Sequence, residues 1–139
     1  MTAVNAVHPI YTAKVLVEQM LARNHLSAIV VTSSGLGTNP YPGILTYSCT
    51  KVFVDYLARG LNFELKGKID CLSWKSLEVS TNMMKKPVGG RVVSPNTAVK
   101  GMLRDLGKYR DTYGCFIHAR SFFWHMPHDW IQASFFKRM

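Results

Sequence analysis

The stretch Ala28-Ile29-Val30-Val31-Thr32 decides the fold class of this chain. Its apolar residues follow one another directly, whereas a strand with one solvent-exposed face alternates apolar and polar residues. Most of them are β-branched. A short run of this kind indicates a strand covered on both faces, which is typical of parallel sheets. We therefore interpret it as one strand of an α/β fold.

The residues before this strand predict a helix, and those after it a loop. Upstream, apolar residues recur at helical spacing between Ile10 and Leu21. Pro9 suits either the first turn of that helix or a kink in a longer helix that begins near Ala3. Downstream, the residues 33–42 are rich in Ser, Gly, Asn and Pro, which predicts a loop.

The rest of the chain continues the alternation of helices and strands. The further predicted elements are a helix over 44–65, a strand over 68–74, an irregular stretch over 75–93, a helix that starts at Ser94-Pro95 and ends at Gly107, and a strand over 114–118. Alternation of this kind implies parallel strands joined by crossover helices. Three strands correspond to about half of a doubly wound sheet.

Composition places the chain among globular proteins and argues against a metal site. It has 139 residues, 47% of them hydrophobic and 18% charged, which is about one domain. Three cysteines without a CxxC pair do not indicate a disulfide framework. His118, His125 and His128 lack Cys or Glu at ligand spacing, so we predict no metal site.

The net charge of +9 suggests an acidic partner. The basic residues are dispersed, and adjacent pairs occur only at Lys85-Lys86 and Lys137-Arg138. No basic helix or stripe stands out, so the pattern does not favour nucleic acid. An acidic protein or a lipid surface fits the charge equally well.

Candidate chemistry centres on Tyr47 and Lys51, which are four positions apart at the start of a predicted helix and therefore share one helix face. A phenol holds its proton tightly at neutral pH, and a cation about 4 Å away favours the phenolate by up to about 4 kcal/mol at an effective dielectric of about 20. Ser34 follows a strand at its carboxyl end, where open α/β sheets bind ligands, so its hydroxyl can hold a substrate carbonyl beside Tyr47. Taken alone, such a Tyr–Lys pair is also common on solvated helix faces.

Several motifs occur together in this sequence. Ser33-Ser34-Gly35 is followed, thirteen positions after Ser34, by Tyr47 in a Tyr-x-x-x-Lys motif, and Val4-Asn5 precedes the first helix. The combination resembles the short-chain dehydrogenase/reductase family. The stretches 47–55, 79–83 and 114–119 resemble its branch of hydroxysteroid dehydrogenases and very-long-chain 3-oxoacyl-CoA reductases. The resemblance covers nearly the whole chain.

The resemblance implies roles in carbonyl reduction. Tyr47 is the expected proton donor, Lys51 is expected to favour its phenolate and to hold the nicotinamide ribose, and Ser34 is expected to orient the substrate carbonyl. Asn5 is expected to support a proton relay through water and Lys51, and Thr81 to contact the nicotinamide or its phosphate. The hydride is expected from NADPH or NADH.

The resemblance also implies an amino-terminal nucleotide-binding half that this sequence lacks. That half of the doubly wound, Rossmann-like sheet carries the glycine-rich turn that seats the cofactor pyrophosphate. Gly35-Leu36-Gly37 does not replace the turn, because it lacks the third glycine and lies in the serine loop. Lys75-Ser76-Leu77 stands where the family has Pro-Gly, which puts the nicotinamide contact in doubt. We therefore expect NADP(H) or NAD(H) binding only if a partner supplies the missing half, and no activity of the isolated chain.

The strand Ala28 to Thr32 is expected to need a partner. In the family's sheet this strand pairs with one from the missing half, and a bare hydrophobic edge invites pairing or aggregation. We therefore expect an obligate protein partner that covers this edge.

We divide the chain into a partial short-chain dehydrogenase/reductase domain over 1–118 and an aromatic tail over 119–139. The tail concentrates aromatic residues in Phe122-Phe123-Trp124, Trp130 and Phe135-Phe136. It is expected to pack on its own domain or a partner, or to lie on a membrane surface. The resembled branch often lies on internal membranes, so the expected location is intracellular, at the endoplasmic reticulum or a mitochondrial membrane.

Two functional hypotheses follow. In the first, the chain is the catalytic half of a split reductase for a ketosteroid or a 3-oxoacyl substrate, favoured by Asn5, Ser34, Tyr47 and Lys51. In the second, it is a non-catalytic accessory subunit of a larger complex, favoured by the missing half, the altered Pro-Gly region and the positive charge.

Overall fold

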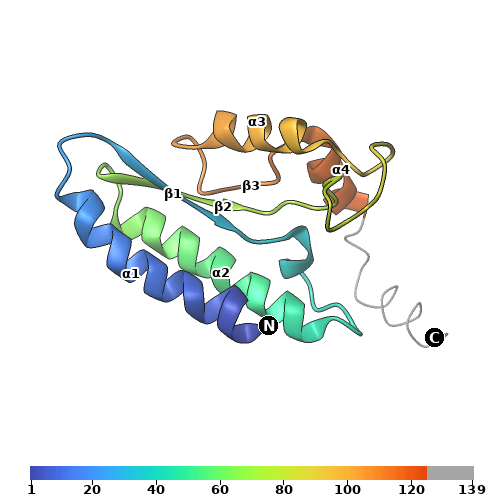
Figure 1. Cartoon of the computed structure of the whole chain (residues 1–139), viewed down its shortest axis with the longest axis horizontal. Coiled ribbons are helices and arrows are strands. Elements are labelled where there is room, and N and C mark those ends of the chain that lie inside the picture. Colours follow the sequence, from blue (N-terminus) through green and yellow to red (C-terminus); the bar gives the residue numbers. More distant parts are fainter. Residues whose placement is uncertain (125–139) are drawn as a thin grey trace.

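A three-stranded parallel sheet forms the framework of the molecule, in a computed structural model that describes residues 1–124 (Figure 1). The strands lie in the order β1 (Ser27–Thr32), β2 (Ile69–Trp74) and β3 (Asp111–Thr112). The predicted α/β fold with parallel strands is therefore confirmed. The pairing of β1 with β2 runs from Ser27↔Ile69 to Thr32↔Trp74, whereas β3 joins β2 only through Ser73↔Asp111 and Trp74↔Thr112.

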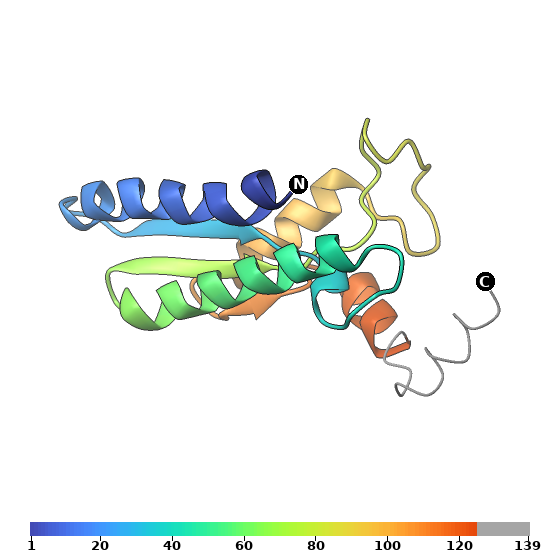
Figure 2. The ribbon, with the colours of Figure 1, turned by 90° about the horizontal axis from the view of Figure 1, so that it is seen from below.

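Helices cover both faces of this sheet. The helical segments are η1 (Ala3–Val7), α1 (His8–Leu21), the short turn η2 (Gly35–Gly37), α2 (Leu45–Glu64), α3 (Pro95–Asp105) and α4 (Phe116–Trp124). Helices α1 and α2 lie side by side on one face, α3 lies on the other, and α4 sits at one end of the sheet (Figures 1 and 2). Among residues 1–124, no helix is both long and apolar enough to cross a membrane.

The hydrophobic core lies between the sheet and the layer of α1 and α2. Val54 and Ala58 of α2 pack with Val31 of β1, and partly buried Ile29 joins that cluster. A second cluster lies further along the sheet and contains Leu65, Ile69 and Cys71 together with Val17, Met20, Ile29 and Leu61. Of the successive apolar residues of β1, Ile29 and Val31 therefore face the layer of α1 and α2, whereas Ala28 is exposed and Val30 is half-buried.

The first helix takes the longer of the two predicted forms. It begins at Ala3 with a π-helical turn and continues through Pro9 to Leu21. Proline lacks the N–H that would bond to a carbonyl four residues earlier, and a wider turn accommodates that loss at the start of α1. The helices predicted over 44–65 and from Ser94-Pro95 are also confirmed, the latter with the Ser94 hydroxyl accepting a hydrogen bond from the Thr97 N–H at 3.1 Å.

The strand predicted over 114–118 is wrong. The third strand ends at Thr112, and Phe116 begins α4 instead. Gly114 has φ +77°, a left-handed conformation that favours glycine, and its N–H donates to the Thr112 hydroxyl at 2.9 Å. This turn separates the strand from the apolar run that follows, and a short apolar run fits a buried helix as well as a strand.

Candidate active site

A pocket of about 330 Å³ opens where segments following the three strands meet. Its walls come from the loop after β1, the start of α2, the long segment after β2, and α4. The lining residues are Ser34, Gly35, Leu36, Tyr41, Tyr47, Leu77, Glu78, Met84, Arg91, Ser121 and Phe122. The pocket therefore lies at the carboxyl end of the sheet, where open α/β sheets bind ligands.

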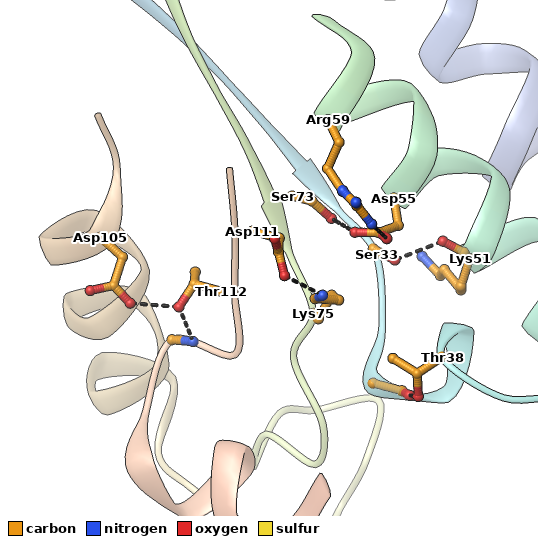
Figure 3. A network of polar contacts seen from close by, with 12 residues as sticks. Ser33, Thr38, Lys51, Asp55, Arg59, Ser73, Lys75, Asp105, Asp111 and Thr112 are labelled. Atoms are coloured by element: carbon orange, nitrogen blue, oxygen red, sulfur yellow. Dashed lines mark hydrogen bonds and ion pairs between the residues drawn. The ribbon is translucent and has the colours of Figure 1, made fainter. Parts of the chain in front are cut away.

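Ser34 lines this pocket from the loop after β1. Its hydroxyl accepts a hydrogen bond from the Leu36 N–H at 3.2 Å, and the residue is 6% exposed. The neighbouring Ser33 hydroxyl donates to the Lys51 carbonyl at 2.7 Å, which ties the serine loop to α2 (Figure 3). A Cβ on Gly37 would lie 2.8 Å from the Lys51 carbonyl carbon, so glycine permits this close approach. The Gly35-Leu36-Gly37 segment is thus a packing feature of the serine loop.

Tyr47 and Lys51 share a face of α2, as their spacing predicts. The Lys51 ammonium lies 5.7 Å from the centre of the Tyr47 ring and donates a hydrogen bond to the Thr32 carbonyl at 2.9 Å. Partial burial lowers the pKa of Lys51 because it disfavours the charged form. Tyr47 lines the pocket together with Ser34, whereas Lys51 lines a neighbouring groove.

This groove of about 270 Å³ lies between α1 and β1, and Asn5 and Thr32 also line it. The Asn5 amide donates to the Thr50 hydroxyl at 3.3 Å, which links η1 to α2 across 45 positions of sequence. The structure therefore brings Asn5 and Lys51 to one groove, separate from the pocket that Ser34 and Tyr47 line. The proposed relay role of Asn5 stays a prediction.

Thr81 is not brought together with these residues. It lies in an exposed turn of the segment after β2, where its hydroxyl accepts from the Met84 N–H at 3.3 Å. It lines neither the pocket nor the groove. The predicted cofactor contact of Thr81 is therefore not visible in this arrangement and stays a prediction.

His118 fixes the wall of the pocket that follows β2. Its side chain is fully buried and accepts the Leu77 N–H on Nδ1 at 3.3 Å, so Nε2 carries the proton and faces the Glu78 carbonyl at 3.1 Å. Both ring nitrogens thus form hydrogen bonds with the backbone of the segment after β2. The sequence predicted no metal site at His118 and gave it no role in this pocket, and His125 and His128 lie outside the described residues.

Lys75 also serves packing in this structure, at the position where the family has Pro-Gly. It forms an ion pair with Asp111 (Figure 3). Its ammonium lies 5.4 Å from the centre of the Tyr113 ring. Tyr113 in turn stacks on Phe122 of the pocket wall, with 5.2 Å between ring centres. Burial, together with the nearby Asp111 carboxylate, raises the pKa of Tyr113. Lys75 therefore packs on Tyr113, which in turn packs on Phe122 of the pocket wall.

Most residues of the pocket wall were not predicted from the sequence. Leu77, Met84 and Arg91 come from an irregular segment without periodicity, and Ser121 and Phe122 come from α4, which crosses the predicted boundary between 118 and 119. The remaining tail aromatics, Trp130 and Phe135-Phe136, lie outside the described residues. The sequence offers no local signal for these positions, because only tertiary folding brings them together.

The residues present fit one part of a nicotinamide cofactor. The Lys51 ammonium is at the groove and carries three donors, so it can bond a ribose hydroxyl beside Tyr47. A G-x-G-x-x-G phosphate-binding turn does not occur in the sequence. The chain can therefore hold the nicotinamide ribose but supplies no fingerprint for the pyrophosphate.

The family of the chain follows from its sequence similarity. The short chain dehydrogenase family model matches residues 1–90. With the Ser34–Tyr47–Lys51 arrangement already described, this shows that the chain belongs to the short-chain dehydrogenase family.

Among curated relatives, the chain is 38% identical over 103 residues to the very-long-chain 3-oxoacyl-CoA reductase of Anas platyrhynchos, a match that covers 72% of this chain and 32% of that protein. It is 37% identical over 95 residues to the Homo sapiens protein of the same name, covering 66% of this chain and 30% of that protein. The chain thus spans about a third of the length of these relatives.

Solved structures support the fold. A 7beta-hydroxysteroid dehydrogenase superposes with a TM-score of 0.78 at 19% identity, over 92% of this chain and 53% of that one. A short-chain dehydrogenase from Burkholderia cenocepacia in complex with NADP superposes with a TM-score of 0.73 at 16% identity, over 99% of this chain and 58% of that one. At such identities the likeness shows the Rossmann-like fold alone.

Proposed function

We propose that this chain is the catalytic part of a carbonyl reductase that uses NADPH or NADH. The observation that carries the proposal is the convergence of Ser34 and Tyr47 on one pocket, with the Lys51 ammonium against the Tyr47 ring. Two hydroxyl groups that face one cavity can both bond a single carbonyl oxygen. A cation beside one of them can offset the negative charge that forms there when the proton is transferred to the substrate.

In the proposed reaction the Ser34 hydroxyl orients the carbonyl of the substrate, and the Tyr47 hydroxyl gives its proton to the carbonyl oxygen. A bound nicotinamide cofactor supplies the hydride that adds to the carbonyl carbon. The product is the alcohol, and the Tyr47 phenolate takes a new proton from water. The Lys51 ammonium stabilises that phenolate until the proton arrives.

We propose a 3-oxoacyl compound or a ketosteroid as the substrate. The name of the curated relatives supports the first, and a 7beta-hydroxysteroid dehydrogenase among the structural neighbours fits the second. Two neighbours, from Shigella flexneri and Burkholderia cenocepacia, are complexed with NADP, which supports a cofactor of that type. Association with the endoplasmic reticulum or a mitochondrial membrane, through residues 119–139, remains part of the proposal.

We further propose that a protein partner completes the cofactor site and covers the edge of β1. Within residues 1–124 no strand pairs with that edge, and the groove beside it contains Lys51. The alternative function is that of an accessory subunit in a larger complex. Lys75 in the packing of the pocket wall favours this alternative, since it replaces the family's Pro-Gly.

Native isolation with mass spectrometry of all associated proteins distinguishes these two functions. We expect a companion that carries a glycine-rich phosphate turn, and NADPH-dependent ketone reduction by the pair. A large assembly without such a companion would instead support the accessory role. Ketone reduction by the pure 139-residue chain would contradict the need for a partner.

The catalytic role of Tyr47 is tested by Tyr47→Phe in the active preparation. We expect turnover to fall by about a hundredfold or more, because the general acid is removed, while assembly stays intact. Tyr56→Phe is the matched control, since Tyr56 lies on the same helix and is 77% exposed. Equal turnover of Tyr47→Phe and Tyr56→Phe would remove Tyr47 from the mechanism.

A further inference from the structure

The segment between β2 and α3 carries an exposed apolar tip. Residues 81–91 are all exposed, and Figure 2 shows this segment standing out from the body of the molecule. Within the segment Met83 is 95% exposed and Val88 is 61% exposed. Contact of apolar side chains with water is unfavourable, so two of them on a projecting segment indicate a surface that something else covers.

Hydrogen bonds at the base of the segment hold this tip in place. The Lys85 N–H donates to the Thr81 carbonyl at 2.9 Å, and the Ser80 hydroxyl donates to the Lys86 carbonyl at 2.6 Å. The Ser80 N–H donates to the Val93 carbonyl at 2.9 Å, which joins the two ends of the segment. Lys85 has φ +52°, a conformation that residues other than glycine rarely adopt and that persists where the surrounding contacts impose it. The exposure of the tip is therefore built into the turn.

The surroundings of the tip are basic. The sequence has no Asp or Glu between Glu78 and Asp105, whereas it has five basic residues there: Lys85, Lys86, Arg91, Lys100 and Arg104. The Lys86 ammonium pairs with the Glu78 carboxylate at 2.6 Å. The Lys85 ammonium has no acidic partner within residues 1–124, so it is available to an anionic surface. Anionic lipid headgroups attract basic segments of this kind.

A lipid surface fits this tip better than a folded protein does. Specific protein interfaces bury about 800 Å² on each partner and need complementary shapes, whereas the tip presents a few side chains on a projecting turn. A bilayer needs no complementary shape, because apolar side chains can enter its headgroup region. A lysine beside them can bury its aliphatic stem while its ammonium stays among the headgroups.

We propose that this tip docks on an anionic lipid surface, with Met83 and Val88 inserted in the headgroup region and Lys85 in contact with the headgroups. Met84 follows Met83 in the chain and lines the pocket of Ser34 and Tyr47. Docking through the tip therefore brings this wall of the pocket close to the lipid. The surface is separate from residues 119–139, and the inference does not depend on the reductase function.

The test is co-sedimentation of the full chain, together with any companion that native isolation recovers, with lipid vesicles. Vesicles of phosphatidylcholine alone are compared with vesicles in which phosphatidylserine replaces about a third of that lipid. We expect stronger binding to the anionic vesicles, which weakens as salt screens the charges. The double change Met83→Ser and Val88→Ser should weaken this binding by about tenfold or more, and Lys85→Gln should weaken it by about fivefold.

Two control variants match these changes at the opposite end of the sheet. Leu26→Ser removes an apolar side chain that is 75% exposed just before β1. Lys66→Gln removes the same charge as Lys85→Gln from an exposed position shortly before β2. Both controls should bind the anionic vesicles as the native chain does. Circular dichroism checks that each variant keeps its fold, as the exposure of all these positions leads us to expect.

Several outcomes would overturn the inference. Vesicle binding that the tip variants leave unchanged would place the lipid contact elsewhere, for example in residues 119–139. Equal effects of the tip variants and the controls would reduce the result to overall charge and hydrophobicity. No preference for anionic vesicles would remove the role of Lys85. Absence of vesicle binding, with a companion that protects Met83 from oxidation, would make the tip a protein interface. None of these outcomes depends on turnover, so the reductase proposal is tested separately.

Discussion

The two edge strands of the sheet, β1 and β3, differ in how closely the described helices pack beside them. Around β3, α3 approaches the following turn so closely that a Cβ on Gly101 would overlap the Gly114 carbonyl oxygen. Beside β1, no described strand pairs with the edge, and the neighbouring helical segment leaves Val4, Tyr11 and Val15 at least 59% exposed. Helix α3 is thus in close contact with the turn after β3, although no described strand pairs with the outer edge of β3 and a cavity of about 520 Å³ lies beside it. The β1 side presents exposed apolar side chains that further protein can cover.

The largest effect is expected at the contact of α3 with the turn after β3, from Gly101→Ala. The added methyl group would meet the backbone of Gly114, so α3 must move away from the sheet. We expect a loss of about 3 kcal/mol or more in the free energy of unfolding, measured by denaturant titration. Gly60→Ala on α2 is the matched control, because a Cβ added at Gly60 would have no neighbouring atom within 4 Å.

That control should behave in the opposite way. An alanine in a helix interior is favoured over glycine by about 0.5–1 kcal/mol, so Gly60→Ala should stabilise the chain slightly. If Gly101→Ala and Gly60→Ala had equal effects, the close contact between α3 and Gly114 would not exist.

A smaller loss is expected from Asp105→Asn, also on the β3 side. The buried Asp105 carboxylate accepts from the Arg104 guanidinium at 2.7 and 3.0 Å and from the Thr112 hydroxyl at 2.5 Å. Losing the charge should cost about 1–3 kcal/mol at pH 7. The measurement is the thermal unfolding of both proteins.

The pH dependence of that difference follows from the pKa of Asp105. The hydrogen bond from Arg104 is the main cause that lowers this pKa below its ordinary value of 3.8. A lowered acidic pKa stabilises the folded chain above the ordinary value, and the stabilisation disappears as the pH falls through the folded-state pKa. The difference in Tm between the native chain and Asp105→Asn should therefore shrink in acid. A constant difference would contradict the assigned ionisation.

On the β1 side, Lys51→Met should change the free energy of unfolding by less than about 1 kcal/mol, and in the favourable direction. Burial lowers the pKa of Lys51, which means that the folded state disfavours its charge. This cost is present at neutral pH, fades as the pH rises through the lowered folded-state pKa, and is absent above the ordinary value of 10.5. We expect Lys51→Met to raise the Tm at pH 7, to leave the Tm unchanged at high pH, and to abolish turnover. This combination would confirm that Lys51 is retained for function and not for stability. Lys66→Met, at an exposed position, is the control.

The smallest effects are expected from Tyr11→Ser and Val15→Ser on α1. Both side chains are already exposed, at 65% and 59%, so each change should alter the stability of the isolated chain by less than about 0.5 kcal/mol. Val54→Ala, at a site that is 1% exposed, should cost more than about 1 kcal/mol. If a companion covers the β1 side, the α1 variants should weaken its binding. Unchanged binding would place the companion elsewhere.

Sequence patterns predicted the regular elements well where the pattern was long. Helix α2 and the paired strands β1 and β2 were predicted within about two residues, because their apolar residues repeat over many positions. The third strand was misplaced because β3 has two residues and no periodicity of its own. Its position depends on pairing with β2, and Gly114 ends it through a turn that the sequence shows only as one glycine.

The sequence by itself determined that Tyr47 and Lys51 share a helix face and that Ser34 follows a strand, because both depend on spacing along one element. Only the tertiary structure decided that Ser34 and Tyr47 share a pocket while Lys51 faces a groove with Asn5. It also decided that Arg91 and Phe122 complete the pocket. Those contacts join residues tens of positions apart, and no local pattern encodes them, because packing of the whole sheet and its loops sets the distances.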